Sequence, residues 1–141
     1  MEETIVFINF ETLDLAKTYL FGGVKFLDLL LLLSVIDVLT GIIKAWKIGK
    51  LRSRTAWFGY VRKMLSFVVV IVANIIDQIM ALNGVLTFGT VLFYIANEGL
   101  SIVENLAQIG VKIPASITDR LHVIENDSQK EEEKKEKKAA E

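Results

Sequence analysis

The stretch FLDLLLLLSVIDVLTGII, residues 26–43, is long enough and apolar enough to cross a lipid bilayer as one helix. Its length at about 1.5 Å per residue comes to about 27 Å, close to the roughly 30 Å thickness of the hydrocarbon core. Lys25 and Lys44 flank it. We therefore predict a transmembrane helix here and regard a buried helix of a soluble core as the weaker alternative.

Two further segments extend this pattern along the chain. Residues 65–82 read LSFVVVIVANIIDQIMAL, and Asn83–Gly84 then indicates a tight turn. Residues 85–103 form a weaker third candidate, since their uninterrupted apolar part stops before Asn97 and Glu98. The predicted fold class is all-α: an integral membrane helical bundle with three transmembrane helices over residues 26–103.

The flanking segments differ in character from this apolar region. Residues 1–25 mix apolar and charged positions at helical spacing, which is typical of an amphipathic helix at the membrane surface. Residues 104–124 are amphipathic, with a turn expected near Gly110 and Pro114. Residues 125–141 are mostly Glu and Lys, which predicts a charged, flexible and solvated tail.

A basic loop is expected between the first two spans. It contains seven positive charges and no acidic residue: Lys44, Lys47, Lys50, Arg52, Arg54, Arg62 and Lys63. Such a loop belongs on the cytoplasmic side, which predicts a multi-pass protein with its N-terminus outside and its C-terminus inside. Its interleaved aromatic residues favour contact with anionic lipid at the headgroup boundary over nucleic-acid binding.

Polar side chains in the spans are the candidate functional residues, because an ionisable group near the bilayer centre costs at least about 2.5–3.5 kcal/mol. The candidates for packing or assembly are Asp37, Thr40, Gly41, Asn74, Asp77, Asn97, Glu98, Ser101, Glu104 and Asn105. They either hydrogen-bond inside one bundle or line a water-filled opening between several copies, and the surplus of buried acids over buried bases favours the opening. A proton relay is less favoured, since no basic residue is expected inside a span.

Nothing in the sequence favours catalysis. No Ser–His–Asp set or glycine-rich phosphate loop is present, the chain has no cysteine, and its one histidine, His122, lies near the C-terminus. We therefore expect neither an enzyme nor a cofactor or metal site.

Two motifs resemble the toxin-secretion and phage-lysis holins of Gram-positive phages and prophages. The first resembles the family's Asp-x-x-Thr-Gly element with a following Gly-Lys-Leu and small hydroxyl residue: Asp37, Thr40, Gly41, Gly49, Lys50, Leu51 and Ser53. The second resembles its Asn-Glu-x-x-Ser-Ile-x-Glu-Asn element: Asn97, Glu98, Ser101, Ile102, Glu104 and Asn105, with Gly110 and Pro114 after it. The resemblance covers about residues 33–121.

The resemblance implies a protein that accumulates in the bacterial cytoplasmic membrane, forms homo-oligomers and opens lesions. An endolysin or a large toxin then crosses, and the host lyses. Assembly through the small and polar faces would place Asp37 and the Asn97–Glu98 pair at similar depth. Two alternatives stay open: a scaffold or anchor for a partner complex without a pore, and a small ion-coupled transport subunit.

Overall fold

The computed structural model describes residues 10–50 and 54–140, and these residues form five helices without any strand. The helices are α1 (Phe10–Phe21), α2 (Leu27–Ile48), α3 (Arg54–Met80), α4 (Val85–Ile109) and α5 (Ala115–Ala140). The predicted all-α fold class is confirmed.

Three of these helices are long and apolar enough to span a membrane: α2, residues Trp57–Met80 of α3, and α4. The third span, which was the weakest from sequence, is one unbroken helix through Asn97 and Glu98. The fold is therefore a helical membrane bundle, as predicted.

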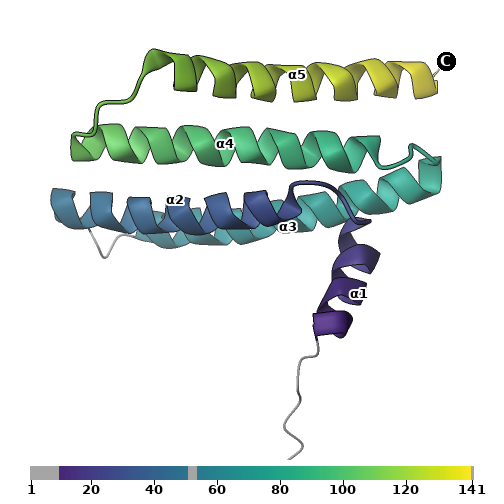
Figure 1. Ribbon diagram of the computed structural model, residues 1–141, viewed down its shortest axis with the longest axis horizontal. Coiled ribbons are helices and arrows are strands. Elements are labelled where there is room, and N and C mark those ends of the chain that lie inside the picture. Colours follow the sequence, from purple (N-terminus) through teal and green to yellow (C-terminus); the bar gives the residue numbers. More distant parts are fainter. Residues whose placement is uncertain (1–9, 51–53, 141) are drawn as a thin grey trace, which may run out of the picture.

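Helix α4 is the centre of the bundle. It packs against α2, α3 and α5, whereas α1 contacts α3 (Figure 1). In Figure 1, α5 lies along α4 on the side away from α2 and α3, and α1 projects away from the other helices. Residues of α2, α3 and α4 can therefore meet in the interior between these three helices.

Among the described residues, buried polar side chains outnumber buried apolar ones. Among the described residues, the buried apolar side chains are Leu27, Leu30, Val70, Ala73, Val91 and Ala96. The buried polar ones are Ser34, Asp37, Thr40, Ser66, Asn74, Asp77, Thr87, Thr90, Glu98, Asn105 and Ser128. Large apolar side chains such as Leu31, Leu39 and Val68 are instead about half exposed. A soluble domain shows the opposite distribution, so the outer surface of these helices suits lipid.

Helix α2 continues past the end predicted at Ile43. It stops at Gly49, whose φ of 76° is left-handed and whose N–H, with that of Lys50, bonds the last carbonyls of the helix. Hydropathy falls where the charges begin, but a helix continues until its backbone turns. Lys44 and Lys47 consequently lie on α2, and Arg54, Arg62 and Lys63 lie on α3.

The C-terminal segment is helical. We predicted a charged, flexible tail over residues 125–141 whose Glu–Lys pairs support transient helix, and residues 125–140 belong to α5. Glu and Lys are good helix formers, and their spacing of four residues supports a helix even without a core. Near its start α5 contacts α4 closely: a Cβ added to Gly99 would lie 2.8 Å from a methyl carbon of Leu121.

Candidate functional site

A charge cluster joins the three spans in the interior of the bundle. Lys63 of α3 forms ion pairs with Asp37 of α2 and with Glu98 of α4, the latter at 2.8 Å between Nζ and Oε2. Asp37 is 2% exposed and Glu98 is 6% exposed, so both carboxylates are removed from solvent. The single ammonium group therefore bridges two buried acids from different helices.

Neutral side chains complete the charge cluster. The Asn105 amide of α4 donates to Asp37 Oδ1 at 2.8 Å and to Thr40 Oγ1 at 3.2 Å. The Thr40 hydroxyl donates in turn to the Asp37 backbone carbonyl at 3.0 Å. Both oxygens of the Asp37 carboxylate are thus occupied, one by Asn105 and one by Lys63. Buried polar groups need such partners, and these bonds tie α2 to α4.

The charge cluster brings together residues that are far apart in the sequence. Asp37 and Glu98 were expected at similar depth, and they share Lys63. The sequence placed Lys63 in the basic loop, but it lies on α3, within the candidate span Trp57–Met80. A usable signal was present: Lys63, Phe67 and Val70 follow helical spacing, so Lys63 shares a face with the buried Val70.

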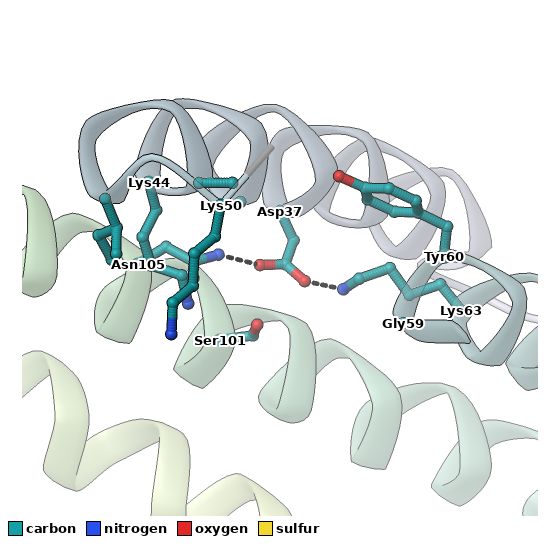
Figure 2. A pocket seen from close by; sticks show the side chains of 11 residues that line it. Asp37, Lys44, Lys50, Gly59, Tyr60, Lys63, Ser101 and Asn105 are labelled. Atoms are coloured by element: carbon teal, nitrogen blue, oxygen red, sulfur yellow. Dashed lines mark hydrogen bonds and ion pairs between the residues drawn. The ribbon is translucent and has the colours of Figure 1, made fainter. Parts of the chain in front are cut away.

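A hollow of about 440 Å³ lies beside the charge cluster (Figure 2). We call it the basic pocket; its polar lining comprises Asp37, Lys44, Lys50, Tyr60, Lys63, Ser101 and Asn105. In Figure 2, Lys63 and Tyr60 lie to one side of Asp37, and Lys44 and Lys50 lie to the other. Among the described residues of its lining, three are lysines and one is an acid, so the pocket is electropositive.

Asn74 has a structural role at the opposite end of α3. Its side-chain amide donates to the backbone carbonyls of Leu20, at 2.9 Å, and Tyr19, at 3.3 Å. These carbonyls belong to the last turn of α1, where helical partners are lacking. A Cβ on Gly22, whose φ is 66°, would collide with Asn74 Oδ1. Asn74 thus fastens α1 to α3.

Asp77 has a comparable role at the start of α4. Its carboxylate accepts from the backbone N–H groups of Leu86, at 3.1 Å, and Thr87, at 2.7 Å, and from the Thr87 hydroxyl. The N-cap residue of α4 is Gly84, which has no side chain to bond these N–H groups. Asp77 supplies that cap from the preceding helix, and its charge suits a helix N-terminus.

The remaining candidate residues for packing or assembly are held less tightly by contacts within the chain. Asn97 and Ser101 are partly buried, whereas Glu104 is exposed and accepts a bond of 3.0 Å from Gln108. Gly41 was expected to allow a close backbone approach, but a Cβ there would meet only the Asn105 amide, at 3.7 Å.

The basic residues are distributed over two helix ends. Lys47 donates to the backbone carbonyl of Ile109 at the end of α4. Arg54 and Arg62 are exposed on α3, and Arg52 lies outside the described residues. In the described parts of the chain no group of three His, Asp or Glu side chains could hold a metal ion.

Comparison with known proteins places this chain in a family. The model of the bacteriophage holin family matches residues 16–126. A probable holin of Bacillus phage phi105 is 74% identical over 92% of the chain and 96% of its own length. The uncharacterised protein YqxH of Bacillus subtilis is 74% identical over 99% of both chains. A 14.9 kDa protein of Clostridium perfringens is 37% identical over 89% of the chain and 98% of its own length. No solved structure matches significantly.

Proposed function

The chain belongs to the bacteriophage holin family, and we propose that it self-associates in the bacterial cytoplasmic membrane and permeabilises it, so that an endolysin or a toxin crosses. Family membership and three apolar helices make it a cytoplasmic membrane protein, and lysis is what the family serves. The observation that carries the proposal is the charge cluster, which joins the three spans around a polar interior.

The orientation we propose is N-terminus outside and C-terminus inside. Lys44, Lys47, Lys50, Arg54 and Arg62 all lie near the junction of α2 and α3. Positive charge that flanks spans is retained in the cytoplasm. The charge cluster and the basic pocket then lie toward the cytoplasmic side, while the ends capped by Asn74 and Asp77 face outward. The same charges would contact anionic lipid headgroups.

Self-association is proposed to use polar residues that the single chain leaves at its surface. Asp37, Asn74, Asp77 and Asn105 are engaged inside the chain, which favours inward packing for them. Asn97, Ser101 and Glu104 follow one another along α4 at helical spacing and are only partly buried or exposed. A stripe of this kind hydrogen-bonds to a second copy or borders water between copies.

Helix α5 constrains how assembly begins. The C-terminal half of α5 carries most of the charged residues of this helix. Charged side chains cannot lie along a span in hydrocarbon. In the structure, however, α5 lies along α4 (Figure 1). We propose that α5 moves into water as α4 becomes surrounded by lipid or by other copies, which frees the face around Gly99 for contact.

Induced expression in a bacterium, with and without a co-expressed wall hydrolase, tests this function. Optical density, membrane potential and entry of a membrane-impermeant dye are followed together. We expect dye entry and depolarisation in both strains, and rapid lysis only with the hydrolase. A membrane that stays impermeable would instead indicate the scaffold, and selective ion flux without dye entry would indicate the transport subunit.

A further inference from the structure

Two surface hollows adjoin each other beside the charge cluster. The first is the basic pocket, of about 440 Å³. The second, of about 280 Å³, lies between α2 and α3 and is lined mainly by Leu31, Val35, Leu39, Met64 and Phe67; we call it the apolar groove. Tyr60 and Lys63 line both hollows, so the two hollows adjoin at these side chains.

The order of the hollows along α2 matches the depth profile of a bilayer leaflet. The basic pocket takes residues from Asp37 to Ile48, at the basic end of the helix. The apolar groove takes residues from Leu31 to Leu39, toward the middle of the span. At 1.5 Å per residue the groove follows about 12 Å of α2, several methylene groups of an acyl chain. Cationic lining thus adjoins the headgroup region, and apolar lining lies beneath it.

The charges of the basic pocket call for an anion. The Lys63 ammonium is already paired with Asp37 and Glu98. Lys44 and Lys50 line the same pocket. Asp37, the acid among the described lining residues, is itself occupied by Lys63 and Asn105. Figure 2 shows both lysines on the side of Asp37 away from Lys63. Two like charges facing one hollow repel each other unless an anion lies between them.

We propose that the two hollows form one binding site for an anionic phospholipid. Its phosphate lies between Lys44 and Lys50, and one acyl chain follows the apolar groove between α2 and α3. The site rests on the proposed function in one respect, that these helices lie in a bilayer. The groove alone would also suit an apolar helix of a second copy. Lys44 and Lys50, in the basic pocket that adjoins the groove, favour the lipid, because they complement a phosphodiester.

Native mass spectrometry of the full chain, released from detergent, tests the headgroup half of the site. The probes are dioleoyl phosphatidylglycerol, dioleoyl phosphatidylcholine and inorganic phosphate. We expect one phosphatidylglycerol to be retained in preference to phosphatidylcholine, without displacement by inorganic phosphate. In Lys44→Gln/Lys50→Gln the affinity should fall about thirtyfold, since each lysine near an anionic surface is worth roughly fivefold. Lys112→Gln/Lys130→Gln removes the same charge from exposed positions outside both hollows and should change little.

A bulky substitution tests the apolar groove, the part of the site proposed to hold the acyl chain. Val35→Trp fills the groove and should lower phosphatidylglycerol retention several-fold, while Val72→Trp, at a similarly exposed position on α3 outside the groove, should not. Equal retention of both lipids, equal loss in the two lysine pairs, or displacement by inorganic phosphate overturns the proposal. So does cross-linking of a second copy to Val35→Cys regardless of lipid. Dye entry in living cells is a separate readout, so failure of the lipid site and failure of the proposed function are distinguishable.

Discussion

Lys63 balances two carboxylates that would otherwise face each other in the bundle interior. The formal charge of Asp37, Lys63 and Glu98 together is negative by one unit, and Lys44 and Lys50 of the basic pocket lie nearby. An uncompensated charge in a membrane span costs at least about 2.5–3.5 kcal/mol. The fold tolerates two buried acids here because one ammonium group reaches both.

Replacing Lys63 should therefore destabilise the bundle. In Lys63→Met the two carboxylates lose their shared cation, and we expect the free energy of unfolding to fall by about 2–4 kcal/mol. This is near the roughly 3–5 kcal/mol of a fully buried pair, reduced because the Lys63 side chain is 23% exposed. Thermal unfolding in detergent measures it. Arg62→Met, at an exposed neighbouring position, is the control.

A compensating variant separates lost pairing from lost packing. Asp37→Asn/Glu98→Gln added to Lys63→Met removes both orphaned charges and should recover most of the lost stability. A Lys63→Met protein as stable as Arg62→Met would show that the charge cluster does not hold the spans together.

Neutralising a single acid should act on function more than on folding. Asp37→Asn or Glu98→Gln leaves Lys63 with one carboxylate, so the ion pair persists in a cluster without net charge. Since such a cluster is easier to accommodate in lipid, we expect a change in lysis timing or in the oligomers trapped by cross-linking. Timing and cross-linked species that both match wild type in the two variants would refute a role in assembly.

At the scale of helices, the sequence predicted which segments cross the membrane better than where helices end. Hydropathy identified the apolar spans, but α2 continues through Lys44 and Lys47 to Gly49. Hydropathy reports the solvent around a residue, whereas the end of a helix depends on backbone turns and caps. The same limit assigned Lys63 to a loop, although its long side chain can extend from a span toward a partner.

The partners of Asn74 and Asp77 were also beyond sequence reasoning. Asn74 and Asp77 are three residues apart and so lie on one face of α3, which fits either a pore or a packed interior. The structure shows that they bond the ends of α1 and α4, with Asn74 reaching carbonyls 54 and 55 positions earlier in the chain. Such contacts depend on how the helices pack against one another. The spacing of residues within a single helix carries no information about that packing.

Two adjacent glycines offer a matched test of how α1 is held. Gly22 and Gly23 have φ values of 66° and 65°, so alanine at either position is strained by about 1–2 kcal/mol. Only at Gly22 would the new Cβ meet Asn74, while the space at Gly23 is open. We expect Gly22→Ala to displace Asn74 and to speed amide hydrogen exchange in the last turn of α1. Equal exchange in Gly22→Ala and Gly23→Ala would contradict this role of Asn74.

For the whole molecule, the lipid-facing surface and α5 impose opposite requirements. The outer faces of α2 and α3 expose large apolar side chains, which suits hydrocarbon. Helix α5 is strongly polar, yet it lies along α4 (Figure 1). Both conditions hold at once only where the outer side of α5 faces water. Complete immersion of α4 in lipid therefore requires α5 to separate from it.

A reversible cross-link between α4 and α5 tests this separation. The chain has no cysteine, so Gly99→Cys/Leu121→Cys introduces one pair, and it also removes the leucine that a Cβ at position 99 would strike. With the disulfide closed, α5 stays beside α4, and its charges would each cost at least about 2.5 kcal/mol inside the bilayer. We expect purified oxidised protein to release little dye from lipid vesicles and reduced protein to release it fully, with Leu121→Cys alone insensitive to oxidation. Equally fast release in both states would mean that permeabilisation proceeds with α5 still against α4.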